Sequence, residues 1–406
     1  GWGGYWAWDP VENASLIPWF GATAFLHTSL VETRRGALHR TNVFMIALTL
    51  LLCFLATYLV RSGVVDSLHA FSSEGVGRPL MIFLLAGAAV AILAIQAGFA
   101  EGPRGRQLTA LFSLEGFLIM TMWLLLTLGG VILAGTFWPV ISQLWSANPV
   151  GLEAGFYNKV CLPFFTLLVL FLAVCPWLGW KSGVRRVKIL AGIGVFFVLA
   201  GGAILALGYT KPLALVAASG SVACLTGIVV LFVAEPSVRK RRRAWAAYGT
   251  HLGLALVALG VAFSGPYQLE REVVLKPNES LEIGAYTVTF HGATQRRTQA
   301  MDILIADLGV TKDGQTVGTL TPERRLYRKF PQPFAEVSVI PGLGDEVYAT
   351  LLGLDKGDAA MLKISIHPLV NWIWIGGTLM SLMPLLGLGG LKRRTTPEAE
   401  DVAREH

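Results

Sequence analysis

The amino-acid sequence predicts a polytopic α-helical membrane protein with one small β-rich domain outside the cytoplasm. Of its 406 residues, 54% are hydrophobic and only 15% are charged, and the mean hydropathy is +0.59. Globular domains carry about a quarter charged residues, so this composition indicates a membrane protein. The pattern along the chain agrees, because long apolar stretches alternate with short basic loops.

Nine apolar stretches reach the length of about 17–25 residues that a helix needs to cross a bilayer. They lie near 14–33, 42–61, 79–100, 115–138, 159–180, 188–208, 212–234, 246–265 and 369–390. We therefore expect a helix bundle over residues 1–265, with a tryptophan-rich loop at 1–15, and a last membrane helix within 368–391. The short polar tail, 392–406, is expected to be disordered.

The basic residues orient these helices in the membrane. Every second loop is rich in arginine and lysine, as in Arg239 to Arg243 and Lys392 to Arg394, whereas the other short loops hold only Arg61, Arg78, Lys159 and Lys211. The positive-inside rule then places the opening loop outside and the C-terminus in the cytoplasm. These loops also account for the net charge of +7, so the charge does not indicate a nucleic-acid partner.

The polar segment 266–367 interrupts the helical pattern and predicts a small β-sandwich or barrel. Its apolar and polar residues alternate in four runs: "YTVTF" at 286–290, "DILIADLGV" at 302–310, "AEVSVI" at 335–340 and "MLKISI" at 361–366. Turn signals such as Lys312-Asp313-Gly314 separate them. The topology places this domain outside.

The chain opens with "GWGGYWAWDPVENAS", an unusually dense aromatic segment. The rings are Trp2, Tyr5, Trp6 and Trp8. Such a set fits a surface that lies flat against a large planar apolar ligand; the alternative, a membrane-interface belt, spreads its Trp and Tyr residues over helix ends. Asp9 precedes Pro10, as at many helix starts, so we assign Asp9 and Glu12 a loop-shaping role.

Two of the seven histidines, His27 and His251, fall within apolar spans, where an ionisable side chain is costly and indicates function. His27 lies seven residues before Arg34, and His251 lies eight residues after Arg243. Both are thus roughly 10–12 Å from the cytoplasmic face. Two histidines at matched depth on different helices suit the axial ligands of one b-type haem. The alternative is that each is a neutral core histidine bonded to a nearby hydroxyl.

The remaining histidines and the cysteines carry weaker signals. His69 lies in the outer loop "RSGVVDSLHAFSSEG", where a lone histidine is usually solvated, and His367 is expected to be an interfacial anchor before Pro368. No site role is assigned to His39, His291 and His406. The cysteines lack metal-ligand spacing and are expected to be buried small hydrophobes: Cys53, Cys161, Cys175 and Cys224.

The segment "WGGYWAWDPVENASLIPW" resembles the tryptophan-rich WWD signature of haem-handling membrane proteins. Its "DPVENAS" continuation is typical of the CcmF family, the haem lyase subunits of bacterial cytochrome c maturation, and of the nitrite-reductase-specific paralogue NrfE. Four further segments are similar to this family: "LVRSGVVDSLHAF" at 59–71, "GTHLGLALVALGVAFSG" at 249–265, "TPERRLY" at 321–327 and "HPLVNWIWIGG" at 367–377.

This resemblance implies roles for individual residues. It implies that His27 and His251 ligate haem b, and that His69 is the second of two outer-face histidines that ligate the substrate haem. The platform for that haem would comprise Trp2, Tyr5, Trp6, Trp8 and Asp9. Tyr5 stands where the family usually has tryptophan. The family's first outer histidine lies upstream of this segment and the chain has no initiator methionine, so we expect an N-terminal truncation. No catalytic residue is assigned.

The resemblance also implies an activity in the bacterial inner membrane. Haem would be taken on the outer face from a chaperone that carries it covalently, and attached by thioether bonds to the CxxCH motif of apocytochrome c. The implied partners are this chaperone, apocytochrome c, membrane lipid, and the thiol-reducing and apocytochrome-delivery subunits of the maturation complex. A quinol is a further candidate partner, as an electron source.

Two other functions remain open from the residues. A haem transporter would need ligands at several depths, whereas the two intramembrane histidines share one level. A quinol-oxidising subunit with a permanent b-haem would not need an external aromatic loop and a loop histidine. The sequence does not fully distinguish the lyase from such a subunit. It also does not distinguish the general lyase from its nitrite-reductase-specific form.

Overall fold

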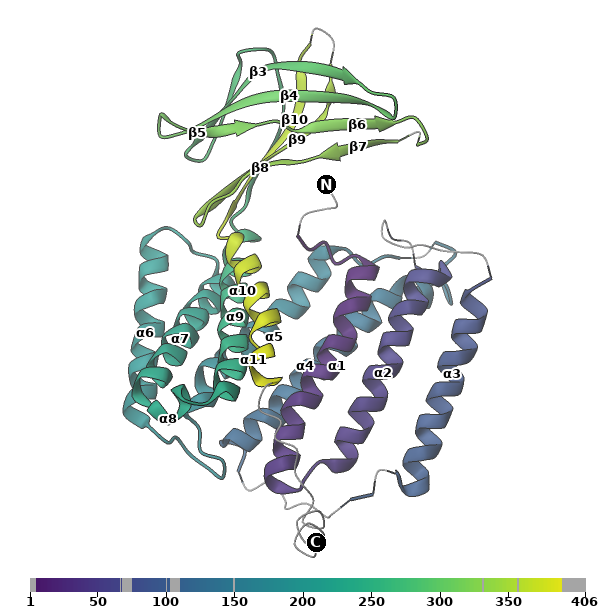
Figure 1. Ribbon diagram of the computed structural model, residues 1–406, viewed down its shortest axis with the longest axis vertical. Coiled ribbons are helices and arrows are strands. Elements are labelled where there is room, and N and C mark those ends of the chain that lie inside the picture. Colours follow the sequence, from purple (N-terminus) through teal and green to yellow (C-terminus); the bar gives the residue numbers. More distant parts are fainter. Residues whose placement is uncertain are drawn as a thin grey trace, which may run out of the picture. The chain divides into compact units, whose positions relative to one another are not determined.

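The computed structural model describes residues 5–65, 67, 75–99, 101–102, 110–148, 150–330, 332–355 and 358–388. Within these ranges, nine helices are long and apolar enough to cross a membrane, and a β-domain follows the eighth of them (Figure 1). The predicted fold class is therefore confirmed. The chain divides into two compact units, residues 1–192 and 193–406, and each is described by itself. The tail 392–406 lies outside the described residues.

The helices of the first unit pack in a row (Figure 1). In contact order they are α3 (Gly77–Ala94), α2 (His39–Ser62), α1 (Pro10–Arg35), α4 (Leu114–Ser142) and α5 (Ala154–Val174). A π-helical turn, Ile95–Phe99, prolongs α3, and a 3₁₀ turn, Cys175–Trp177, prolongs α5. The core lies where α1 meets its neighbours and includes Phe20, Ala24, Leu128, Ile132 and Cys161.

The ends of α1 follow local capping rules and extend the predicted span at both ends. Asp9 caps the N-terminus, Pro10 occupies the first helical position, and Gly36 ends the helix in the left-handed conformation with φ 66°. The prediction placed the start near residue 14 because the first turn is polar. A capping box lets this polar turn continue the helix beyond the apolar stretch.

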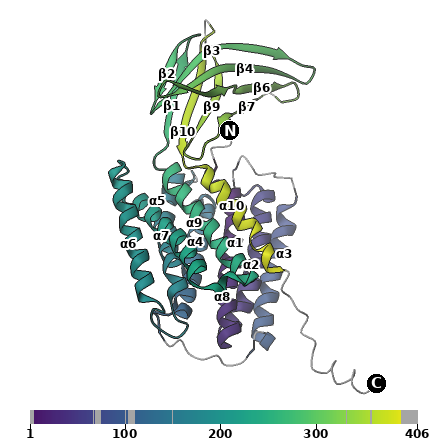
Figure 2. The same ribbon diagram turned by 60° about the vertical axis from the view of Figure 1, so that its left-hand side comes forward.

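The second unit contains most of α6 (Val187–Ala206) and all of α7 (Pro212–Ala234), α9 (Arg242–Ser264) and α10 (Asn371–Leu382), with short α8 (Pro236–Arg239) and α11 (Leu385–Leu388). Helix α9 packs against both α7 and α10, and Figure 2 shows α9 and α10 side by side. Their backbones meet at two glycines, since a Cβ on Gly253 would lie 2.6 Å from the carbonyl oxygen of Gly376. Small residues at such a crossing are typical of membrane helices.

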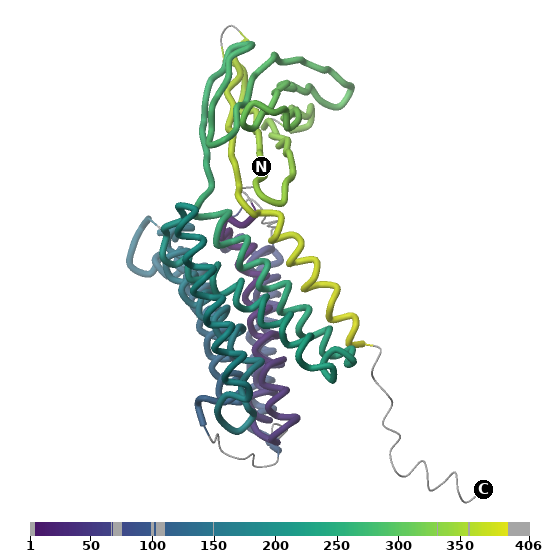
Figure 3. The backbone as a smooth tube through the Cα atoms, turned by 90° about the vertical axis from the view of Figure 1, so that its left-hand side faces the viewer, coloured from purple at the N-terminus to yellow at the C-terminus, as the bar shows by residue number. Residues whose placement is uncertain are grey.

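The β-domain is inserted between α9 and α10. Figure 3 shows that the connections from α9 into β1 and from β10 into α10 lie next to each other. The start of α10 is tied to the loop before β9, because Asn371 Nδ2 donates to the Gly342 carbonyl at 2.9 Å and Trp372 Nε1 donates to the Leu343 carbonyl at 3.0 Å.

The domain is a sandwich of two antiparallel sheets. One sheet has the order β1 (Leu269–Leu275), β10 (Ala360–Pro368), β9 (Asp345–Leu354), β8 (Ser338–Ile340). The other has the order β2 (Ser280–Ile283), β3 (Tyr286–Arg297), β4 (Met301–Lys312), β6 (Glu323–Tyr327), β7 (Pro333–Glu336), and β5 (Gln315–Leu320) pairs with β4. Buried side chains from both sheets, such as Val288, Phe290, Leu351 and Ile364, form one core.

One predicted strand differs from the structure, and one predicted turn is confirmed. The run 335–340 is not one strand: β7 pairs with β6 in one sheet and β8 pairs with β9 in the other, so the chain changes sheets at Val337. The predicted turn after Lys312 is observed as a two-residue hairpin, with φ 48° at Asp313 and 78° at Gly314. Positive φ at both central positions matches the twist of the flanking strands.

Candidate functional site

The two carboxylates after the aromatic residues hold the backbone of this loop. Asp9 Oδ1 accepts hydrogen bonds from the Val11 amide at 2.8 Å and from the Ser67 hydroxyl at 2.6 Å. Glu12 Oε2 accepts from the amides of Ala7 at 2.9 Å and Asp9 at 3.1 Å. These bonds fix the start of α1 and tie it to the segment after α2, which is the loop-shaping role expected for both residues.

Trp8 anchors the loop onto α5. Its ring stacks on Tyr157 with centroids 5.0 Å apart and planes at 10°, and its Nε1 donates to Asn158 Oδ1 at 2.8 Å. Trp6 meets Trp8 edge-on at 5.8 Å and 89°. Trp8 has φ 59°, a conformation that is rare for a large side chain and needs such supporting contacts.

Beneath Trp8 lies a buried polar contact between α1 and α4. Asn13 is fully buried, and its Nδ2 donates to the Trp8 carbonyl and to Thr136 Oγ1, both at 3.1 Å. Neither Asn13 nor Tyr157 was predicted to support the aromatic loop. Both residues lie just before predicted apolar spans, which begin near 14 and 159, and nothing local indicates which distant residue each one contacts.

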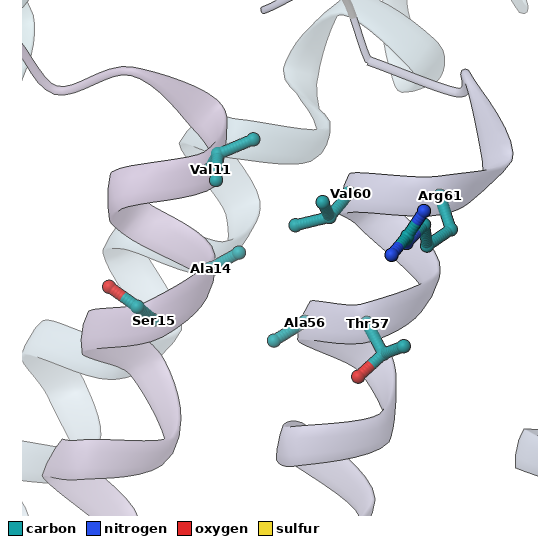
Figure 4. A pocket seen from close by; sticks show the side chains of 7 residues that line it. All are labelled: Val11, Ala14, Ser15, Ala56, Thr57, Val60 and Arg61. Atoms are coloured by element: carbon teal, nitrogen blue, oxygen red, sulfur yellow. The ribbon is translucent and has the colours of Figure 1, made fainter. Parts of the chain in front are cut away.

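A groove of about 280 Å³ lies next to this loop, between the N-terminal end of α1 and the C-terminal end of α2 (Figure 4). Its walls are small or apolar except for one guanidinium. The lining residues are Val11, Ala14, Ser15, Ala56, Thr57, Val60 and Arg61.

Within the first unit, His27 is half-buried on α1. Its Nδ1 lies 2.7 Å from the Thr23 carbonyl oxygen, and a carbonyl only accepts, so Nδ1 carries the proton in the neutral ring. This tautomer places the lone pair on Nε2, the atom that would coordinate a metal. His251 is half-buried on α9, in the second unit. The pairing of these two histidines therefore stays a prediction from the sequence.

His69 and Trp2 lie outside the described residues, and Tyr5 is half-buried. Among the histidines without an assigned site, His39 Nδ1 lies 2.5 Å from Glu32 Oε1 at the α1–α2 turn. His367 lies in β10, with Nε2 3.1 Å from the Ser365 hydroxyl and its ring edge-on to Tyr348. Burial lowers the pKa of His367 below its ordinary value.

The cysteines only partly match their prediction. Cys161 and Cys224 are buried, but Cys53 is exposed and Cys175 is intermediate. Cys53 lies on an exposed face of α2, so an apolar span does not require every small apolar side chain in it to be buried. In the described part of the chain, no three histidine, cysteine or carboxylate side chains are placed to hold a metal ion.

A buried ion pair that was not predicted joins two helices of the first unit. Arg35 and Glu115 approach to 2.7 Å, with side-chain exposures of 11% and 2%. They join the C-terminal end of α1 to the N-terminal end of α4. Arg35 therefore contributes to the packing of the first unit.

Two family models match the chain. "CcmF C-terminal beta-sandwich" matches residues 266–368, and "Cytochrome C assembly protein" matches residues 1–65. The first match covers the β-domain, and the second covers the aromatic loop, α1 and α2.

Curated relatives extend the similarity over nearly the whole chain. The cytochrome c-type biogenesis protein CycK of Bradyrhizobium diazoefficiens is 33% identical over 97% of this chain and 62% of its own length. The protein CcmF of Escherichia coli is 31% identical over 98% of this chain and 63% of its own length. NrfE of Haemophilus influenzae is 27% identical over 97% of this chain and 63% of its own length.

A solved structure agrees with these relatives. The cytochrome c haem lyase CcmF matches with a TM-score of 0.77 and 27% identity, over 95% of this chain and 61% of that one. The chain thus spans less than two thirds of the length of these relatives. This multi-pass membrane protein is thus similar, over nearly its whole length, to the CcmF family of cytochrome c-type biogenesis proteins.

Proposed function

We propose that the protein is a cytochrome c haem lyase component, which takes haem from a chaperone and attaches it to the CxxCH motif of apocytochrome c through thioether bonds. The observation that carries this proposal is the aromatic loop, held rigidly by Asp9, Glu12 and the Trp8–Tyr157 stack in a chain similar to this family. A rigid aromatic surface suits a planar apolar substrate, because its rings lose little freedom when the ligand binds.

In this proposal the aromatic rings of the loop have two different roles. Trp8 supports the loop because Tyr157 covers one of its faces, while Trp6, Tyr5 and Trp2 contact the substrate haem. Each aromatic contact contributes about 0.5–1.5 kcal/mol beyond burial. Several rings together hold haem and still allow its transfer. His69 supplies one axial ligand to this haem and orients it.

A second haem, of b type, is held by His27 and His251 in the same proposal. The Thr23 carbonyl bonded to His27 Nδ1 supports it, because metal-ligating histidines usually direct their other ring nitrogen to such an acceptor. Such a haem would supply electron transfer, with a quinol as the proposed source of the electrons. The Thr23 carbonyl would set the tautomer of the His27 ring, and the positions of His27 and His251 along their helices would set the depth of the haem in the membrane.

The proposed location is the bacterial inner membrane, with the aromatic loop and the β-sandwich in the periplasm. The charge asymmetry of the loops supports this orientation. Reporter fusions near residues 300 and 395 test it: the first should report the periplasm and the second the cytoplasm. The haem chaperone, apocytochrome c and the thiol-reducing and delivery subunits would then meet the protein on its outer face.

The function is tested with the full-length protein in a strain that lacks its own lyase. His69→Ala should abolish holocytochrome c on a haem-stained gel while the b-haem absorbance of the purified protein remains, because the two sites use different ligands. His27→Ala and His251→Ala should each remove that absorbance. His291→Ala, in the β-domain, is the matched control. Normal holocytochrome c with His69→Ala would refute the role of His69 as a haem ligand, whereas no holocytochrome c with the wild-type protein would refute the lyase assignment and favour a quinol-oxidising b-haem subunit.

A further inference from the structure

The groove between α1 and α2 combines an apolar surface with a single cation. The two hydroxyls in its lining are bonded within their own helices, Ser15 to the Glu12 carbonyl at 2.7 Å and Thr57 to the Cys53 carbonyl at 3.1 Å. Both thus contribute little polarity. Arg61 supplies the charge, and Figure 4 shows its guanidinium beside Val60 at one end of the groove.

Arg61 has no anionic partner among the described residues. Its side chain is exposed, and in this part of the chain it forms no ion pair, in contrast to Arg35 with Glu115. A cation in the last turn of α2 also interacts favourably with the helix dipole. That interaction acts along the helix, however, and does not account for a guanidinium that borders an apolar groove.

The groove adjoins the segments that the proposed function assigns to the substrate haem. Its α1 wall begins at Val11, two residues after Asp9, and its α2 wall ends at Arg61, just before the segment that leads to His69. The Asp9–Ser67 hydrogen bond of 2.6 Å joins these two segments. A haem on the aromatic loop would therefore have one edge next to this groove.

The chemistry of haem matches this combination of surfaces. One edge of the porphyrin carries two propionates and the other carries the vinyl groups. The groove volume of about 280 Å³ is at the lower limit of small-molecule pockets, about 300–1,000 Å³. It therefore admits an edge of the ring and not the whole ring. A guanidinium binds a carboxylate with two parallel hydrogen bonds, which fixes both distance and orientation.

We propose that Arg61 is the propionate anchor of the substrate haem, and that the α1–α2 groove receives the propionate edge of the porphyrin. This inference rests on the proposed function. With the propionates held at Arg61, the vinyl edge faces away from the groove and toward an incoming CxxCH motif. Arg61 is thus a positioning residue, which selects the orientation of haem that presents its vinyl groups to the cysteine thiols.

The test compares two ligands that differ only at the propionates. Full-length protein in lipid nanodiscs, with its intramembrane haem in place, is titrated with haem and with haem dimethyl ester, and binding is followed by the Soret absorbance. Arg61→Gln should weaken haem binding about 10- to 100-fold, as expected for a lost hydrogen bond to a charged group. The ester should bind wild type and Arg61→Gln equally, and Arg61→Lys should restore part of the affinity for haem.

Arg78→Gln is the matched control, because it removes an exposed arginine near the start of α3 and should leave both affinities unchanged. Unchanged haem affinity in Arg61→Gln, or an equal loss for haem and ester, would overturn the inference. Native mass spectrometry that finds a phospholipid released by Arg61→Gln, with haem affinity intact, would assign the groove to lipid and also overturn it.

The proposed function fails separately. If wild type binds no haem besides its intramembrane one, both proposals are overturned. If His69→Ala abolishes binding and Arg61→Gln does not weaken it, only the propionate anchor is overturned.

Discussion

Replacing Asp9 with alanine should release the aromatic loop from the start of α1. The change removes the N-cap acceptor of the Val11 amide and the bond from the Ser67 hydroxyl. Loss of an N-cap costs about 0.5–2 kcal/mol, and a hydrogen bond to a charged group contributes about 1.5–3 kcal/mol. Because Asp9 is half-exposed, water recovers part of both, and we expect a local loss of about 2–3 kcal/mol.

Amide hydrogen exchange measures this loss directly. The amides of Ala7, Asp9, Val11 and Asn13 are all hydrogen-bonded at the loop, and their protection reports the free energy of local opening. At about 1.4 kcal/mol per tenfold, their exchange should accelerate about 30- to 150-fold in Asp9→Ala. Asp9→Asn keeps an acceptor oxygen and should lose much less.

Asp307→Ala, which removes an exposed carboxylate from β4, is the control and should leave the loop unchanged. Unaltered exchange at these four amides in Asp9→Ala would refute the conclusion that this carboxylate holds the loop.

Three further predictions test other parts of the structure. Tyr157→Leu removes the ring stacked on Trp8 and should lower the holocytochrome c yield on a haem-stained gel through a loss of about 1 kcal/mol; Tyr157→Phe keeps the stack, and an equal defect in both variants would contradict this reasoning. Gly253→Val places a side chain 2.6 Å from the Gly376 carbonyl oxygen and should prevent accumulation of folded protein in the membrane, whereas the control Gly377→Val meets no atom within 4 Å; similar levels of both variants would show that α9 and α10 need no close approach. Burial lowers the pKa of His367 in the folded protein, so on acidification the unfolded state takes up the proton before the folded state does, and the β-domain should lose stability as the pH falls below about 6.5. Denaturant unfolding at pH 7.5 and 5.5 should show this loss in wild type and a smaller loss in His367→Gln. Equal pH dependence of the two proteins would exclude His367 as its source.

Features encoded over short stretches of sequence were predictable. The nine membrane-length helices of the described residues follow from apolar length. Asp9-Pro10 indicated a helix start because capping depends on adjacent residues, although the apolar stretch itself begins only near residue 14. The hairpin at Asp313-Gly314 was visible for the same reason, since both residue types tolerate positive φ.

Features that depend on tertiary packing were not predictable. The Trp8–Tyr157 stack joins residues far apart in the chain, and no local pattern indicates that partnership. The split between β7 and β8 at Val337 also escaped prediction, because a continuous apolar alternation does not reveal which sheet each half joins. The exposure of Cys53 also escaped prediction, because hydropathy alone does not show which face of a membrane helix packs against the rest of the protein.

Formation of the thioether bonds is the most direct measurement of the central claim. The full-length protein in nanodiscs is mixed with haem-loaded chaperone and a reduced apocytochrome c that contains CxxCH, and the cytochrome is analysed by mass spectrometry. The account predicts a product heavier by one covalently bound haem with wild-type protein, and none with His69→Ala. Equal amounts of product from both, or no product from wild type in the presence of its maturation partners, would contradict it.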